Sequence, residues 1–352
     1  MVSVDAQEGA GVKALAYPAL TGRPVAGDRV LLNTTALHQG LGTGGYALVV
    51  AIPDRLPPDP ELAGHVVKAR YTPLQATVAS VDEQDSPHHD LLREADSIDG
   101  MPVVVADLHS ALPAILAGLR SPAVPSGSGA PPPPGPAVAY VMQDGGALPA
   151  WFSRTIAGLR AAGWLAGTVT TGQSFGGDLE AVTVHTGLLA ARHVLGADAA
   201  IVTQGPGNLG TGTRWGYSGV AAGEAVNAAA ALGGRPVASL RVSFADPRER
   251  HQGVSHHSLT AYGRVALAPA DIVVPKLPGD AGARVAAEAA ALSGRHRIIA
   301  HDVDGLADAL RSCPVGLSTM GRGLDEDLPY FLACAAAGRH AARLLSGQQP
   351  AT

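Results

Sequence analysis

Beyond residue 137, apolar runs of strand length alternate with segments of helical period, and this alternation constrains the fold more than any other feature. The apolar runs occupy residues 137–142, 165–170, 199–203, 237–242, 272–274 and 298–300. Helical periodicity occupies residues 148–162, 179–195, 220–232, 259–267, 282–292, 303–310 and 329–345. Because the strand runs are too uniformly apolar to expose one face, we predict an α/β domain over residues 137–352, with a doubly wound, mostly parallel, Rossmann-like sheet.

The first part of the chain has a different pattern. Short strands separated by Gly, Pro and Asp turns are predicted at residues 29–34, 46–52, 66–71, 77–81 and 101–106. Residues 1–120 are therefore expected to form a small β-rich, barrel-like domain closed by a helix over 111–120. Residues 121–136, SPAVPSGSGAPPPPGP, have no periodicity and are predicted to be a linker or an insertion.

Charge and composition limit the partners. The 352 residues carry a net charge of −5 with no block of like charge, so neither nucleic acid nor a membrane surface is an expected partner. No apolar run reaches the roughly 20 residues of a membrane helix. The N-terminus has no basic, apolar leader, and Cys313 and Cys334 cannot form a disulfide framework, so we expect a cytoplasmic protein. From the charge balance we expect a small, near-neutral or anionic partner, with a small-molecule anion favoured.

The loops after the predicted strands are richer in polar residues than the loops before them. They cover residues 143–146, 170–178, 204–219, 243–258 and 301–305, whereas the opposite edge has plain connectors such as Gly163 and Gly196. In open α/β sheets, ligands bind beyond the carboxyl ends of the strands. The asymmetry predicts a small-molecule site at this edge, although Gly and Asp are also ordinary turn and cap residues.

One glycine-rich loop matches G-x-G-x-x-G over residues 205–210, directly after a predicted strand. It follows the third strand of its domain rather than the first, and the next strand ends in Ser243 and Phe244 instead of an acidic residue. A dinucleotide fingerprint is therefore disfavoured, the cofactor stays unknown, and an extended loop that binds an anion is the favoured interpretation. Its candidate ligand-binding residues are Gly205, Gly207, Asn208, Gly210, Thr211, Gly212 and Arg214.

The segment 246–257 contains the densest set of ionisable side chains. His251 and His256 are candidate acid/base residues, with Asp144 or Asp246 as the carboxylate that orients them. Arg248 and Arg250 are expected to bind an anion together with Arg214. The spacing matches no known metal signature, and the neighbours His256 and His257 would face opposite ways in an extended chain, so no metal site is predicted.

Residues 172–176 match G-x-S-x-G between a predicted strand and a predicted helix, which is the setting of a serine nucleophile. Ser174 is therefore an alternative catalytic residue, although the segment from Asp144 to Ser174 is short for an α/β-hydrolase. Gly176, Gly177 and Asp178 are further candidate ligand-binding residues. Asp178 is also expected to cap the helix predicted over 179–195.

Several of these segments together resemble an uncharacterised bacterial family, of actinobacterial type, known only as a domain of unknown function. The resemblance is carried by residues 33–35, 41–45, 175–178, 205–212, 244–257 and 320–325, and the 244–257 stretch is its most specific part. The resemblance spans nearly the whole chain and implies a bacterial cytoplasmic protein. It implies no activity and no catalytic residue.

Three functions are compatible with the sequence. The first is an enzyme that acts on a phosphorylated or carboxylated metabolite at the carboxyl edge of the sheet. The second is a non-catalytic metabolite-binding or homo-oligomeric assembly protein, in which Ala-rich helices such as 220–232 bury a subunit contact. The third is a serine hydrolase that uses Ser174.

Overall fold

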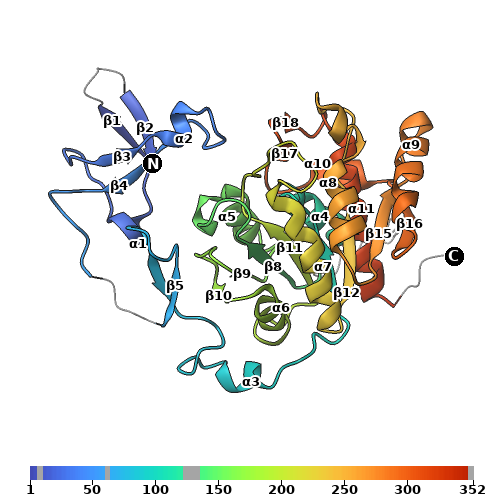
Figure 1. Cartoon of the computed structure of the whole chain (residues 1–352), viewed down its shortest axis with the longest axis horizontal. Coiled ribbons are helices and arrows are strands. Elements are labelled where there is room, and N and C mark those ends of the chain that lie inside the picture. The colour runs from blue at the N-terminus through green and yellow to red at the C-terminus, as the bar shows by residue number, and fades with distance from the viewer. Residues whose placement is uncertain (6–10, 60–63, 122–134, 348–352) are drawn as a thin grey trace, which may run out of the picture. The chain divides into compact units, whose positions relative to one another are not determined.

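The structure, a computed structural model, describes residues 1–5, 11–59, 64–121 and 135–347. It forms two compact units, Met1–Val78 and Ala79–Thr352 (Figure 1). The sequence instead predicted a division at residues 121–136. No helix in the described ranges is both long enough and apolar enough to cross a membrane.

The larger unit is built on a parallel sheet of eight strands in the order β10-β9-β8-β11-β7-β12-β15-β16. The strands are β7 (Pro102–Val105), β8 (Val138–Gln143), β9 (Gly167–Thr170), β10 (Leu179–Glu180), β11 (Ala199–Gln204), β12 (Arg235–Ser239), β15 (Asp271–Pro275) and β16 (Arg297–His301). This confirms the predicted α/β class and its parallel sheet. The central apolar runs are strands with both faces covered, such as β8 and β11, whereas the edge strand β16 is partly exposed.

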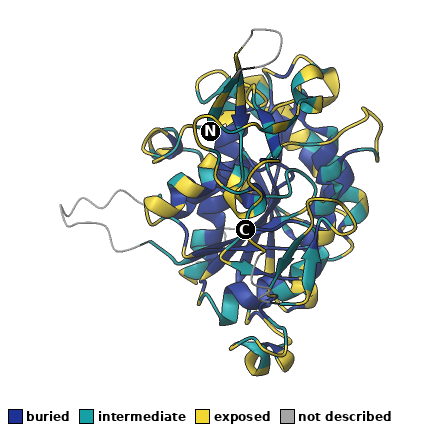
Figure 2. Cartoon of the chain, turned by 90° about the vertical axis from the view of Figure 1, so that its left-hand side faces the viewer, coloured by how far each residue is buried: buried dark blue, intermediate teal, exposed yellow. Residues whose placement is uncertain are grey.

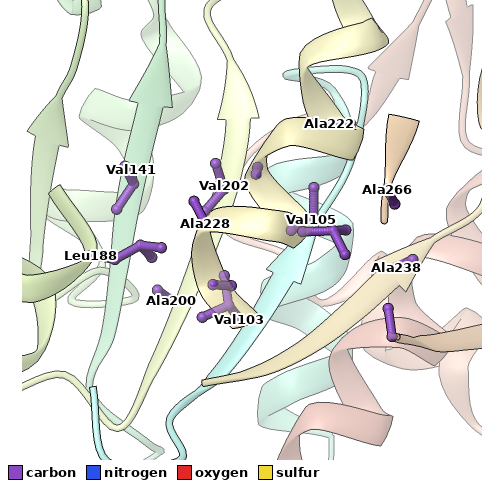
Figure 3. Close-up of a cluster of buried hydrophobic side chains, with 14 of the residues drawn as sticks. Val103, Val105, Val141, Leu188, Ala200, Val202, Ala222, Ala228, Ala238 and Ala266 are labelled. Carbon is purple, nitrogen blue, oxygen red and sulfur yellow. The ribbon is translucent and has the colours of Figure 1, made fainter. Parts of the chain in front are cut away.

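Helices cover both faces of this sheet. They are α3 (His89–Arg93), α4 (Ala111–Arg120), α5 (Arg154–Ala161), α6 (Val184–His193), α7 (Ala221–Ala231), α8 (His256–Thr260), α9 (Gly279–Ala289), α10 (Leu306–Arg311) and α11 (Leu328–Leu345). Alternate strand residues point to opposite faces. Val103 and Val105 therefore belong to the apolar cluster that includes residues of α6 and α7 (Figure 3) and of α9, whereas Val104 belongs to the cluster that includes residues of α4, α5, α10 and α11.

The strand β7 lies near the middle of the sheet, between β11 and β12, and all four of its residues are buried. The sequence had assigned this strand to the N-terminal domain with the helix that follows it. In the structure α4 packs closely on α11, where a Cβ atom on Gly338 would lie only 1.9 Å from the carbonyl oxygen of Ile115. Both β7 and α4 therefore belong to the larger unit.

The helix expected from residue 179 begins later, at Val184, and the side chain of Thr183 caps it. The expected cap by Asp178 is wrong. The Asp178 carboxylate instead accepts hydrogen bonds from the backbone N–H (2.9 Å) and the hydroxyl (2.8 Å) of Thr168. The short strand β10 occupies the intervening residues because it extends the sheet beside β9.

The smaller unit contains a four-stranded sheet in the order β1-β2-β4-β3 and a separate β5-β6 hairpin. Its elements are β1 (Val2–Asp5), β2 (Gly11–Leu15), α1 (Pro18–Thr21), β3 (Leu31–Asn33), α2 (Thr35–His38), β4 (Ala47–Ala51), β5 (Val66–Lys68) and β6 (Ala76–Val78). Over the described residues the outer strands β1 and β3 do not pair, so the sheet is open and does not form the expected barrel. Its buried apolar cluster is small, with Ala14, Ala47 and Val49 at its centre, whereas buried residues fill the interior of the larger unit (Figure 2).

Candidate functional site

After β7 the chain turns toward one face of the sheet, and after its two neighbours, β11 and β12, it turns toward the other face. The helix α4, after β7, packs in one apolar layer, whereas α7, after β11, and the helical turn 261–265, after β12, pack in the other. In open α/β sheets, ligands bind beyond the carboxyl ends of strands at such a change of direction. The loops after β7, β11 and β12 are therefore the place where this fold favours a site.

Three histidines meet in the segment after β12. His251 ends the short helical turn Glu249–His251, and His256 and His257 begin α8. One nitrogen atom from each imidazole lies within 4.8 Å of the other two. The expectation that His256 and His257 face opposite ways is wrong, because Ser255 caps α8 and the pair is helical rather than extended; their ring centroids are 4.5 Å apart.

Burial keeps two of these imidazoles neutral at pH 7. The pKa of His251 is lowered to about 3, first by burial and then by the charge of Arg241. The pKa of His256 is lowered to about 4 by burial and then by the other imidazole and nearby arginines. The Nδ1 atom of His251 is 2.7 Å from the Ser255 hydroxyl, while the buried Nε2 atom of His256 has no hydrogen-bond partner among the described residues. A neutral nitrogen with an open lone pair can accept a proton or bind a metal ion.

The carboxylate of Asp107, just after β7, faces the histidines. Its Oδ2 atom is 3.5 Å from Nδ1 of His257 and 3.9 Å from the guanidinium of Arg241, which follows β12. Burial opposes ionisation of Asp107, but His257 and Arg241 together hold its pKa below the ordinary value. The Oδ2 atom is itself buried without a hydrogen-bond partner in the described part of the chain. In folded proteins such atoms usually contact an ordered water, an ion or a ligand.

A buried ion network supports this cluster. Arg241 also pairs with Asp246 at 3.4 Å, and Asp246 pairs with Arg248 at 2.8 Å. Arg322, in β18 (Arg322–Gly323), pairs with Asp246 at 3.5 Å and with Asp327 at 2.9 Å. The network thus contains three arginines and the three aspartates Asp107, Asp246 and Asp327, so its charges balance.

The two carboxylates that the sequence proposed as partners of the histidines have other contacts. Asp246 accepts hydrogen bonds from the backbone N–H and the guanidinium of Arg248, and these bonds lower its pKa strongly. Asp144 is exposed and accepts a hydrogen bond from the backbone N–H of Gln173 at 2.8 Å. Asp107, which the sequence analysis missed, is the carboxylate that faces His257.

The glycine-rich loop after β11 reaches the histidine segment. A Cβ atom on Gly212 would lie 3.8 Å from the Arg250 guanidinium. At the end of the loop, the Tyr217 ring stacks on His257 with a centroid distance of 3.7 Å, and its hydroxyl donates to the His257 carbonyl at 2.8 Å. The loop is thus held against the histidine cluster at Tyr217, and its tip, which includes Arg214, is exposed to solvent.

Other residues of this loop hold its own shape. The Asn208 side chain accepts hydrogen bonds from the Ser218 hydroxyl (2.8 Å) and the Gln204 amide (3.3 Å), and the Thr211 N–H donates to the Gly216 carbonyl. A Cβ atom on Gly205 would lie 2.3 Å from the carbonyl oxygen of Ala147, so this glycine is needed for close packing. Gly207, at φ +91°, and Gly210 complete the turn.

The loop after β9, which contains Ser174, is a separate region. The residue Gly176 packs against the Trp151 ring, and its N–H donates to the Glu180 carboxylate at 2.6 Å. A Cβ atom on Gly177 would lie 2.9 Å from the backbone of Thr170. The Ser174 hydroxyl is buried without a hydrogen-bond partner among the described residues, so no described base is positioned to activate it. The loop also leads into β10 rather than into a helix, unlike a nucleophile elbow.

Four residues of the site were missed from the sequence: His257, Asp107, Arg241 and Tyr217. Asp107 follows the buried run of β7, so the strand-end rule would have selected it if β7 had been placed in the sheet. Arg241 lay inside the strand predicted over 237–242, but β12 ends at Ser239. Tyr217 carries no local signal, since its role depends on stacking against His257.

Comparison with known proteins gives one match. A family model described as "Protein of unknown function (DUF3866)" matches residues 13–338. No curated protein and no solved structure matches the chain.

Proposed function

The chain belongs to the DUF3866 family of proteins of unknown function, and we propose that it is an enzyme that acts on a small phosphorylated or carboxylated metabolite at the carboxyl edge of its sheet. The observation that carries this proposal is the meeting of Arg250 and the Gly212 backbone beside the three histidines. An anion-binding loop and groups able to move protons thus lie next to one another. A doubly wound, Rossmann-like arrangement of the sheet is part of the proposal, as is a cytoplasmic location.

Two arginines are suited to bind the substrate anion. Arg214 and Arg250 are exposed, and neither has an ion pair in the described part of the chain. Arg248 differs, because Asp246 already neutralises it at 2.8 Å. A phosphate or carboxylate can accept two parallel hydrogen bonds from a free guanidinium, which supports Arg250 and Arg214 as the substrate-binding residues.

His256 is the best-placed acid/base residue. It is only half-buried, and its Nε2 atom has no hydrogen-bond partner among the described residues. The charge of Arg250 contributes to the lowered pKa of His256, so the two side chains are within electrostatic range. An anion bound at Arg250 would reduce that charge and make the imidazole a stronger base.

The test is a turnover screen with the full-length protein. The protein is incubated with panels of phosphorylated and carboxylated metabolites, and loss of substrate is followed by mass spectrometry. We expect His256→Ala to reduce turnover of an accepted substrate by at least about 100-fold, within the usual contribution of acid/base catalysis. The control is His185→Ala, at an exposed position of α6. Arg250→Ala should mainly raise KM, with Arg264→Ala, at another exposed arginine, as its control.

The same screen distinguishes the alternatives. Binding of an anion that is lost in Arg250→Ala, without turnover of any compound, would favour a non-catalytic metabolite-binding protein. Turnover that persists in His256→Ala and disappears in Ser174→Ala would favour a serine hydrolase. Either result would contradict the proposed role of the histidine cluster.

A further inference from the structure

We propose that His251, His256 and His257 together bind one divalent transition-metal ion of the zinc class, with Asp107 as a positioning residue behind His257. The inference rests on the proposed site but not on the proposed reaction. In the metal-bound form it replaces acid/base catalysis by His256, because a nitrogen bound to a metal ion has no lone pair left to accept a proton. Three observations support the inference: the three imidazole nitrogens that could bind the ion, the polar groups that contact the other nitrogens of these rings, and the balance of charged residues around them.

The donor set is typical of a transition-metal site. Three imidazole nitrogens lie within 4.8 Å of one another, and one of them comes from a ring whose buried Nε2 atom has no described hydrogen-bond partner. Imidazole suits zinc, copper, iron and nickel. Catalytic zinc sites commonly use three protein ligands and leave the fourth position for water or substrate. Three histidines on two neighbouring turns provide that number.

The second nitrogen of two rings faces a polar neighbour. In His251 the Nδ1 atom lies 2.7 Å from the Ser255 hydroxyl. In His257 the Nδ1 atom lies 3.4 Å from the Arg241 guanidinium and 3.5 Å from Oδ2 of Asp107. Histidines that bind metals usually donate their other N–H to a carboxylate, a carbonyl or a water, and this contact fixes the ring and its tautomer. Metal binding would favour the His257 tautomer whose Nδ1–H points to Asp107 rather than the one that accepts from Arg241, and Nε2 of His251 and His257 would then face the metal.

A small movement would complete the geometry. Zinc–nitrogen bonds of about 2.0–2.1 Å require ligand nitrogens roughly 3.4 Å apart in a tetrahedron. The histidine nitrogens lie up to 4.8 Å apart, so these distances have to shorten by up to about 1.4 Å. His256 can make this movement, because it is half-buried and its free nitrogen has no hydrogen bond to break.

The surrounding charges also fit a cation with an anionic substrate. Arg241 lies 3.4 Å from Nδ1 of His257, but its charge is met by Asp107 and Asp246. The three arginines and three aspartates of the network balance, so the charge of a divalent ion would remain uncompensated. A phosphate or carboxylate group held by Arg250 would supply the missing negative charge. The metal would polarise that group or activate a water molecule beside it.

The experiment is a metal titration of the full-length protein after treatment with a chelator. Co²⁺ serves as the spectroscopic probe and Zn²⁺ as its competitor, and neither readout requires activity. We expect one ion per chain, bound with an absorption spectrum typical of tetrahedral cobalt. His256→Ala should weaken binding at least about 100-fold, and Asp107→Asn about 10- to 100-fold. His185→Ala should bind like the wild type.

Folding of each variant is checked by circular dichroism and thermal melting. Asp107 is buried and charged, so Asp107→Asn can fail to fold, whereas His256 is half-buried and its Nε2 atom has no hydrogen-bond partner in the described part of the chain. A folded His256→Ala variant that binds Co²⁺ and Zn²⁺ as tightly as the wild type would overturn the inference, as would a wild type that binds neither ion. Metal binding without turnover of any anion would contradict only the proposed reaction. Turnover that resists chelation would contradict only the metal site.

Discussion

The carboxyl end of β7 and the contact between α4 and α11 are both buried, but they are built in opposite ways. At the helix contact, small and apolar residues such as Ala335 and Leu112 fill the space, and glycines let the two backbones touch. At the strand end, Asp107, Asp246 and Arg241 are almost fully buried beside the histidines. Apolar burial stabilises a fold directly, whereas buried charges are costly unless they are paired.

The difference indicates which region serves stability alone and which serves function as well. Buried atoms without hydrogen-bond partners among the described residues occur in both regions, since Arg339 Nε and His340 Nδ1 of α11 are among them, but only at the strand end do they accompany three imidazoles whose nitrogens lie within 4.8 Å of one another. Here Asp107 Oδ2 and His256 Nε2 are buried without hydrogen-bond partners among the described residues. We therefore expect substitutions at the helix contact to change stability alone, and substitutions around the histidines to change ligand binding.

The largest effect is expected at the centre of the ion network. Asp246→Ala leaves the guanidinium groups of Arg248 and Arg322 without their shared carboxylate and should lower the free energy of unfolding by about 3–5 kcal/mol. The control is Asp144→Ala, which removes an exposed carboxylate. Denaturant unfolding measures both. A loss below about 1 kcal/mol at Asp246 would mean that the network is not a structural support.

A pH effect comes next, from His109. This buried imidazole bonds to the hydroxyls of Tyr140 (2.9 Å) and Ser153 (2.7 Å), and burial lowers its pKa to about 4. Between its ordinary pKa and about 4 the unfolded chain binds a proton that the folded chain does not, so stability falls as the pH falls through this window. The loss from His109 alone amounts to roughly 3 kcal/mol.

The comparison variant for this effect is His109→Gln. Unfolding free energies measured between pH 7 and pH 4 should show a shallower decline than in the wild type, because the other histidines titrate equally in both proteins. If the unfolding free energy fell equally steeply with pH in both proteins, the effect could not be assigned to His109.

A smaller effect is expected at the helix contact. Gly338→Ala places a methyl group against the Ile115 carbonyl oxygen and should cost about 2 kcal/mol, since this overlap exceeds the roughly 1 kcal/mol gained in helix propensity. Gly294→Ala, where a Cβ atom meets nothing within 4 Å, is the control. Co²⁺ binding should not change in either variant. A loss of metal binding in Gly338→Ala would show that the two regions are not independent.

The smallest change in stability is expected at Arg250. Because this side chain is exposed and has no ion pair in the described part of the chain, Arg250→Ala should alter the free energy of unfolding by less than about 0.5 kcal/mol. Binding of inorganic phosphate, measured by calorimetry with Arg264→Ala as the control, should weaken roughly tenfold or more. Unchanged phosphate binding would remove Arg250 from the site.

Much of the larger unit was predictable because its central strands are buried on both faces. The runs at 137–142 and 199–203 match β8 and β11 closely, since few other structures hide five consecutive residues, whereas the edge strand β16 is only partly buried. The lateral order of the strands was not predictable. The neighbours of β7 follow it in the sequence by many residues, and nothing local in Val103–Val105 records which strands lie beside it.

Part of the site was also predictable, because the buried strands show where the loops at their carboxyl ends begin. The strand-end rule selected His251, His256 and Arg250, which lie together in the structure with Gly212. It missed Asp107 because β7 had been assigned to another domain. The rule also gave no reason to group His256 with His257, which were expected to face opposite ways. The helix that brings them together is marked in the sequence only by its cap, Ser255, which is one hydroxyl in a polar loop.

The most direct test of the account is anomalous diffraction at the zinc edge from crystals of the full-length protein grown with Zn²⁺ and phosphate. The account predicts one strong peak bounded by His251, His256 and His257, with a phosphate group between that peak and Arg250. A protein that binds zinc elsewhere, or leaves the three imidazoles apart with no peak between them, would contradict it.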